Sequence, residues 1–282
     1  MVLRKTLMSF LAFAVIGACA PSEEEAPEPR IPVNPTGPDA LPAAITGSAP
    51  APQGQPVHYV PGDTVSAGYV AIPEGDGPFP ALVIIHEWNG LVDRIRQMAD
   101  GFAAEGYVTL AVDLYRGRTG SNREENVALV QETQADREGM INNLNEAVRF
   151  LRAREDVTGR VASMGWCFGG GVALSFALGG ENHDGTAIFY GSLLDDPDSL
   201  GAITHEVYGT FAEMDGGIPP DQVERFVAAL DQVGVPNDVH VYDDVNHGFW
   251  LRVEEDPDVR TAPALDAWQR LKAYLARTLS TS

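Results

Sequence analysis

Hydrophobic and polar positions along residues 57–282 follow two periods in turn, one typical of strands and one typical of helices. Continuous apolar runs such as Ala81–His86 are typical of strands buried on both faces. Apolar residues three and four positions apart, as over residues 92–103, indicate amphipathic helices. The predicted strands are 57–60, 66–72, 81–86, 107–112, 160–164, 186–190, 206–211 and 239–242; the predicted helices are 92–103, 123–154, 168–178, 223–230 and 265–275. This alternation predicts one α/β domain over residues 57–282, with a mostly parallel sheet and helices on both faces.

The first 18 residues are predicted to be an export signal. Arg4 and Lys5 precede an apolar run, residues 7–16, that is too short to anchor a protein across a bilayer. Ile16-Gly17-Ala18-Cys19 resembles a bacterial lipoprotein signal that ends before a lipidated Cys19. The alternative is an ordinary A-x-A cleavage site at 18–20 and a soluble periplasmic protein, although Pro21 then follows the cut directly.

The lipoprotein alternative places the protein in the cell envelope, bound to the membrane only through its lipid anchor. Ala20 stands where lipoproteins retained at the inner membrane have aspartate, so we expect the outer membrane facing the periplasm. Residues 19–56 contain ten of the 20 prolines and almost no large apolar side chains. Such a composition cannot offset the entropy of ordering, so we expect a disordered tether over 19–56.

Charge and cysteine content narrow the function further. The chain has 19 Lys and Arg against 40 Asp and Glu, a formal net charge of −21, which disfavours nucleic acid and anionic lipid surfaces as partners. Its two cysteines are Cys19 and Cys167, so lipidation leaves one thiol and no disulfide framework. Cys167 is then either a small buried apolar residue or a nucleophile.

The surroundings of Cys167 favour the nucleophile. Gly165-Trp166-Cys167-Phe168-Gly169 directly follows the apolar strand 160–164 and precedes a predicted helix. This is the pattern of the nucleophile elbow of α/β-hydrolases, with cysteine in place of serine. Glycines flank the nucleophile because side chains would clash at such a sharp turn, and the helix N-terminus favours a thiolate or an oxyanion.

A cysteine nucleophile needs a base and a group that orients the base, and in this fold both follow it in the chain, acid before histidine. Asp215 follows the strand 206–211, and His247 follows the strand 239–242. Both therefore stand at the carboxyl ends of strands, where open α/β sheets bind ligands. The alternatives are that Asp215 is a turn residue in Asp-Gly-Gly and that His247 is an ordinary surface histidine.

A third motif, His86-Glu87-Trp88-Asn89-Gly90, follows the first long buried strand. A zinc site of the His-Glu-x-x-His type fails, because position 90 is glycine. In this fold the loop supplies one oxyanion donor and the residue after the nucleophile supplies the other, which assigns the N–H groups of Trp88 and Phe168. Glu87 is unusual there, because a carboxylate opposes an oxyanion unless it is paired or protonated.

Together these motifs resemble the dienelactone hydrolase family over residues 57–279. The resemblance rests on His86-Glu87-x-x-Gly90, Asp113-Leu114-Tyr115, Gly165-x-Cys167-x-Gly169, Asp215-x-x-Ile218-Pro219 and His247-Gly248-Phe249. It implies an α/β-hydrolase fold, a Cys167–Asp215–His247 triad, and no metal or organic cofactor. It also implies that Glu87 accepts the thiol proton when substrate binds, so that the cysteine rests as a neutral thiol.

One departure from the family limits the inference about substrate. Family members that act on dienelactone have an arginine soon after Asp-Leu-Tyr to hold the substrate carboxylate, whereas the matching position here is Gly117. Arg116 and Arg118 flank it and either bind a carboxylate or are solvated surface charges. Tyr115, Trp88 and Trp166 are candidate walls of the substrate pocket, or ordinary packing residues.

The sequence therefore predicts a hydrolase that acts on a small carboxylic ester, with a lactone of the dienelactone type as the leading substrate. A broad carboxylesterase or thioesterase of the cell envelope is the second hypothesis, and a non-catalytic surface lipoprotein that uses the fold for binding is the third. We expect a monomer.

Overall fold

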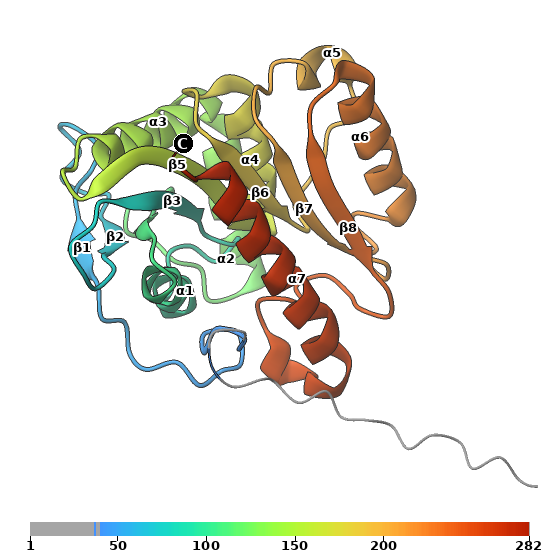
Figure 1. Ribbon diagram of the computed structural model, residues 1–282, viewed down its shortest axis with the longest axis horizontal. Coiled ribbons are helices and arrows are strands. Elements are labelled where there is room, and N and C mark those ends of the chain that lie inside the picture. The colour runs from blue at the N-terminus through green and yellow to red at the C-terminus, as the bar shows by residue number, and fades with distance from the viewer. Residues whose placement is uncertain (1–36, 38–39, 282) are drawn as a thin grey trace, which may run out of the picture. The chain divides into compact units, whose positions relative to one another are not determined.

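The computed structural model describes residues 37 and 40–281, which all fall within one compact unit. Its centre is an eight-stranded sheet in the order β1-β2-β4-β3-β5-β6-β7-β8 (Figure 1). The strands are β1 Gln55–Val57, β2 Gly68–Ala71, β3 Phe79–Ile85, β4 Val108–Ala111, β5 Val157–Trp166, β6 Gly185–Phe189, β7 Val207–Ala212 and β8 Asn237–Tyr242. β2 pairs antiparallel with β1 and β4, and the remaining pairs are parallel. The predicted α/β class and mostly parallel sheet are confirmed.

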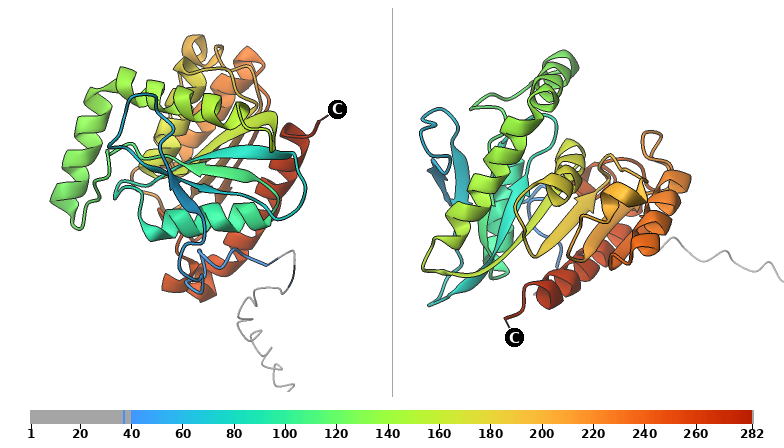
Figure 2. Two further views of the ribbon diagram at one scale, coloured as in Figure 1. Left: turned by 90° about the vertical axis from the view of Figure 1, so that its left-hand side faces the viewer. Right: turned by 90° about the horizontal axis from the view of Figure 1, so that it is seen from above.

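Helices cover both faces of this sheet (Figure 2). The described helices are α1 Asp93–Ala104, α2 Arg123–Ala135, α3 Arg137–Arg152, α4 Phe168–Gly179, α5 Pro197–Leu200, α6 Pro220–Val233, the short 3-10 helix η1 Val253–Glu255, and α7 Pro257–Thr278. α1 and α7 pack on one face, and α3, α4 and α6 pack on the other. None of the helices within 40–281 is long and apolar enough to cross a membrane.

The alternation of side chains along β3 shows why both faces need cover. Leu82 and Ile84 lie in the core under α1 and α7, whereas Ala81, Val83 and Ile85 lie in the core under α3 and α4. All five are fully buried, as expected when successive side chains of a central strand point to opposite faces. The parallel strands β3 to β8 then end at one edge, where the loops that follow them gather.

The segment 123–154, predicted to be one largely helical stretch, forms two helices that meet at Asp136. This residue leaves the helical conformation, with φ −104° and ψ 62°, and its side chain accepts a hydrogen bond from the Gly139 N–H at 2.9 Å. A capping aspartate of this kind ends one helix and begins the next.

The folded region begins earlier than predicted. Residues 40–56, expected to belong to the disordered tether, are placed against the domain; Leu41, Ala44 and Ile45 are buried in the same core as Leu251. The average hydrophobicity of residues 19–56 is low, so the prediction missed this short apolar cluster. Its few buried side chains are enough to hold the segment against the domain. The predicted signal 1–18 and Cys19 lie outside the described residues.

We predict that Ile45→Ala lowers the free energy of unfolding by about 2–5 kcal/mol, because it leaves a cavity where a fully buried side chain packed. Ile72→Ala is the matched control, because Ile72 is 49% exposed and its truncation should change stability by less than about 0.5 kcal/mol. Urea denaturation measures both variants. Equal stability of the two would contradict the assignment of residues 41–45 to the core.

Candidate active site

Cys167 lies at the sharp turn between β5 and α4, as the elbow motif predicted. Its backbone has φ 56° and ψ −118°, a conformation that L-residues rarely adopt. The flanking glycines allow the turn: a Cβ on Gly165 would collide with the backbone of Gly169, and a Cβ on Gly169 would collide with the carbonyl groups of Ile85 and His86. The thiol is partly buried and stands at the N-terminus of α4, where backbone N–H groups favour negative charge.

Asp215 and His247 meet at the carboxyl ends of β7 and β8. The Nδ1 atom of His247 lies 2.6 Å from Oδ2 of Asp215, which is buried. The other carboxylate oxygen accepts hydrogen bonds from the N–H groups of Gly217 at 2.9 Å and Ile218 at 3.3 Å. Asp215 is thus both a turn residue and the partner of the histidine, and its contact directs the opposite ring nitrogen of His247 away from the carboxylate.

The groups around His247 favour the protonated form of its imidazole. Burial alone lowers the pKa of its imidazole, but the hydrogen bonds to Asp215 and Cys167 outweigh burial and raise this pKa to about 10. Burial raises the pKa of Asp215, and the hydrogen bonds from His247 and Gly217 bring it below its usual value. Both groups are therefore charged at neutral pH, which is the state that stabilises a thiolate next to the ring.

Glu87 is paired, and its partner Arg252 was not predicted from the sequence. Oε2 of Glu87 accepts a hydrogen bond from Nη2 of Arg252 at 2.6 Å, and the glutamate side chain is only 3% exposed. Burial raises the pKa of the Glu87 carboxyl, while the charge of Arg252 acts in the opposite direction. The pair resolves the predicted conflict between this carboxylate and an oxyanion. Arg252 stands five residues after His247, and that position was the one available signal.

Tyr190 is a second component that sequence analysis missed. It follows β6 with φ 38°, and its fully buried ring contacts the imidazole of His247 edge to face, with centroids 5.0 Å apart. Its hydroxyl is buried, and among the described residues no side chain forms a hydrogen bond with it, while the Leu251 backbone acts to lower its pKa. Burial, followed by the charge of Glu87, raises the pKa of this phenol, so it remains a neutral donor beside the site.

The two predicted oxyanion donors lie on rigid supports. Phe168 is the first residue of α4, so its N–H is among those that have no partner within the helix. Trp88 lies in the loop after β3, and its carbonyl accepts a hydrogen bond from Oη of Tyr115 at 3.1 Å. No acceptor within residues 40–281 is bound to the N–H of either residue.

His86 fixes the start of the same loop. Its Nε2 accepts a hydrogen bond from the Leu114 N–H at 3.3 Å, so its Nδ1 carries the proton and donates to the Glu87 carbonyl at 2.7 Å. Burial lowers the pKa of this histidine and keeps it neutral. It therefore serves as a structural bridge between the loops after β3 and β4.

Two of the predicted pocket walls are core residues. Trp166 is fully buried and stacks on Trp250 with centroids 5.8 Å apart, because the alternation of β5 turns it toward the core under α7. This favours the alternative that Trp166 is an ordinary packing residue. Tyr115 is also fully buried and holds the Trp88 carbonyl, so it supports the loop from behind. Trp88, in contrast, is partly exposed.

Arg116 and Arg118 are each paired with a carboxylate. Arg116 is mostly exposed and lies 3.8 Å from Asp63, while Arg118 binds Glu132 through both terminal nitrogens and the Tyr115 carbonyl through Nε. Both line a polar cavity of about 510 Å³ whose walls include none of Cys167, Asp215, His247 or Glu87. This favours the alternative that both are solvated surface charges.

A second cavity lies next to Phe168, and its walls, like those of the first, include none of Cys167, Asp215, His247 or Glu87. It has a volume of about 380 Å³ and lies between α3, α4 and the loop after β6. Phe168, Val172 and Leu193 contribute apolar walls, and Arg137 and Ser192 contribute polar groups. Within 40–281, no cluster of three or more His, Cys, Asp or Glu side chains is arranged to hold a metal ion.

Comparison with known proteins bears on the family of this chain. The model of the dienelactone hydrolase family matches residues 66–279. A protein of Methylorubrum extorquens provisionally named a carboxymethylenebutenolidase is 28% identical over 226 residues, which cover 75% of this chain and 77% of the relative. Protein usf of Aquifex pyrophilus is 29% identical over 233 residues, covering 80% of this chain and 100% of the relative.

Solved structures show the same fold. A dienelactone hydrolase-like promiscuous phosphotriesterase from metagenomic libraries superposes with a TM-score of 0.72 at 22% identity, over 82% of this chain and 100% of that one. The family match spans most of the present chain, including the segments that contain Glu87, Cys167, Asp215 and His247. The chain therefore belongs to the dienelactone hydrolase family and is a carboxylic ester hydrolase.

Proposed function

We propose that the protein hydrolyses activated carboxylic esters, lactones foremost, through a Cys167–His247–Asp215 triad. The observation that carries this proposal is the 2.6 Å contact between His247 and Asp215 beside a cysteine held at positive φ. A cysteine kept only for packing needs neither the strained backbone nor a charged histidine next to it.

In the proposed first step, the Cys167 thiolate attacks the ester carbonyl carbon and forms a carbon–sulfur bond. The N–H groups of Trp88 and Phe168 bind the oxyanion, and the carbon–oxygen bond then breaks as His247 gives its proton to the leaving alkoxide. The high pKa of His247 owes part of its value to Cys167. Because the thioester is neutral, this part is lost on acylation, and the imidazole becomes a base that activates water for deacylation.

Glu87 and Arg252 are proposed to control the charge of the thiol. Held by Arg252, the Glu87 carboxylate is satisfied and unavailable as a base. A substrate that has its own carboxylate can replace Glu87 on the guanidinium, since arginine binds either group in the same geometry. Glu87 is then left buried without its partner and takes the thiol proton, because an isolated buried carboxylate favours its neutral form. Arg252 replaces Arg116 and Arg118 as our candidate for carboxylate recognition.

The side cavity next to Phe168 supports substrates with an apolar part. Its volume of about 380 Å³ lies within the range of small-molecule sites. Broad carboxylesterase or thioesterase activity uses the same triad and differs only in the groups that this cavity and Arg252 accept. The cell envelope, with lipidation at Cys19, remains the proposed location because of the sequence of residues 1–20.

Cys167→Ala is predicted to lower kcat/KM on p-nitrophenyl acetate and on a dienelactone by at least about 10³-fold, since the variant lacks the attacking atom. Steady-state kinetics measure the loss, and an unchanged melting curve serves as the control for folding. Activity that persists in the variant would reject the triad. A wild type without activity on any ester would favour the non-catalytic binding hypothesis.

Asp215→Asn is predicted to lower the pKa of His247 from about 10 toward the ordinary value of about 6.5, because a charged hydrogen-bond partner is lost. Titration of the imidazole by NMR measures this shift. Since the folded-state pKa is raised, the stabilisation from His247 is complete below about pH 6.5 and is lost as pH rises through about 10 in the wild type. An unshifted titration in the variant would show that Asp215 does not hold the imidazolium.

A further inference from the structure

Residues 41–49 form a strap that lies against the segment containing Arg252. Leu41, Ala44 and Ile45 share one core with Leu251 and Val253. The Ile45 carbonyl accepts a hydrogen bond from the Val253 N–H at 2.9 Å. The strap precedes the part of the chain that the family model matches, which begins at residue 66. It is therefore a feature of this chain rather than of the matched family region.

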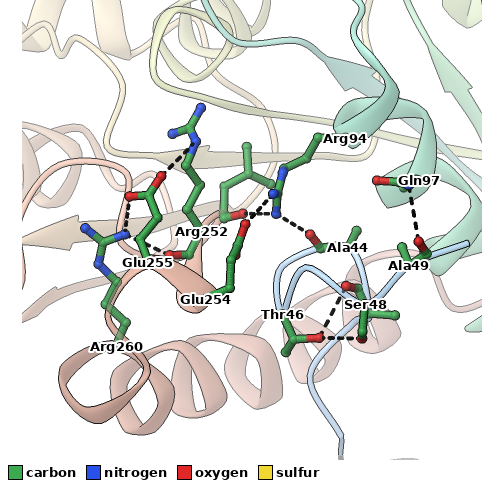
Figure 3. Close-up of polar contacts among 12 residues, drawn as sticks. Ala44, Thr46, Ser48, Ala49, Arg94, Gln97, Arg252, Glu254, Glu255 and Arg260 are labelled. Atoms are coloured by element: carbon green, nitrogen blue, oxygen red, sulfur yellow. Dashed lines mark hydrogen bonds and ion pairs between the residues drawn. The ribbon is translucent and has the colours of Figure 1, made fainter.

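Arg94 of α1 joins the strap to the same segment (Figure 3). Its Nη1 donates to the Ala44 carbonyl on the strap and to the Leu251 carbonyl at 3.1 Å, and its Nη2 binds the Glu254 carboxylate. The strap backbone also packs on that carboxylate side chain, since a Cβ on Gly47 would lie 3.1 Å from Cγ of Glu254. One guanidinium thus connects the strap to two residues of the segment 251–254.

These contacts hold the chain on both sides of Arg252. Arg94 binds the carbonyl of the preceding residue, and the strap binds the N–H of the following one. The carbonyl of Arg252 itself accepts from Arg260 at 2.7 Å, so three consecutive residues have a fixed backbone. Figure 3 shows Arg94 and the strap on one side of the segment and Arg260 on the other. The free end of Arg252 then reaches Glu87.

We propose that Arg94 and the strap are a positioning element that aims Arg252 at Glu87. Arg94 forms no hydrogen bond with the triad or with Glu87, although its charge favours the ionised form of Glu87. Its hydrogen bonds act on Arg252 through the backbone at Leu251 and through Glu254. The inference rests on the proposed function, in which Arg252 pairs with Glu87 and binds the substrate carboxylate. Its consequence is that part of the segment predicted to be a membrane tether, residues 41–49, belongs to the support of the active site.

The alternative is that the strap only stabilises the fold. A double-mutant cycle separates the two, because mutations that act through one group are not additive. We expect Arg94→Met to lower kcat/KM on a carboxylate-bearing lactone by about tenfold in the wild type and by less than about twofold when Arg252→Met is already present. Equal losses in both backgrounds, or no loss in the wild type, would overturn the proposal.

Arg96→Met is the matched control, because Arg96 lies on the same helix and forms its ion pair with Asp93, away from the strap. It should leave kcat/KM unchanged in both backgrounds. Arg94→Lys, which keeps the charge, should recover part of the loss. If Arg94→Met does not fold, Arg94→Gln takes its place; if Arg252→Met does not fold, the pair Glu87→Gln/Arg252→Met serves as the background.

A second cycle needs no substrate. The rate constant for alkylation of Cys167 by iodoacetamide is measured in the same four proteins, and the proposal predicts that Arg94→Met changes it only while Arg252 is present. Non-additive alkylation in a protein that hydrolyses no ester would retain the positioning element and reject the proposed function. If the protein hydrolyses esters but both the kinetic cycle and the alkylation cycle are additive, the proposed function is retained and the positioning element is rejected.

Discussion

The backbone at Cys167 is the constraint on which the site depends. A residue at φ 56° between a strand and a helix is tolerated only where its neighbours approach without side chains, and Gly165 and Gly169 provide that space against the loop after β3. The same close contact sets Gly169 against the carbonyl groups of Ile85 and His86, directly before Glu87 and Trp88 in the chain. Strained backbone of this kind persists because the surrounding sheet and helices determine it. The strain therefore positions Cys167, the proposed nucleophile, together with the N–H of Phe168, a proposed oxyanion donor.

Two charged pairs surround this cysteine, and each has a different effect. Asp215 and His247 hold a positive charge next to the sulfur, and Arg252 neutralises a buried glutamate on the other side. In both pairs the carboxylate side chain is 3% exposed, and a buried carboxylate is costly to leave without its partner, so each carboxylate constrains the position of the cation that it binds. Arg252 in turn depends on a backbone held by Arg94, the strap and Arg260. Support of the site thus extends to residues 44–47, more than 200 positions before Arg252 in the chain.

Sequence analysis predicted those components whose signals are local. The elbow, the acid and the histidine each follow an apolar strand, and their order along the chain agrees with the fold. Arg252 escaped because its partner Glu87 lies 165 residues away, and a single sequence does not show such pairings. Tyr190 depends on a backbone angle that no residue pattern encodes. Trp166 was a candidate pocket wall because it precedes Cys167 in sequence, whereas strand alternation turns it toward the core under α7 and favours the packing alternative.

The strap shows where a prediction of disorder from amino-acid composition fails. The proline-rich sequence around Leu41, Ala44 and Ile45 predicted disorder, yet a few buried apolar side chains and one arginine hold the segment against the domain.

The central claim, that Cys167 is the nucleophile, is tested most directly by trapping the acyl-enzyme. Rapid acid quench of the protein during turnover of p-nitrophenyl acetate, followed by peptide mass spectrometry, should find one acetyl group on the peptide that contains Cys167. Turnover with the acetyl group on another residue, or with none on Cys167, would contradict the account.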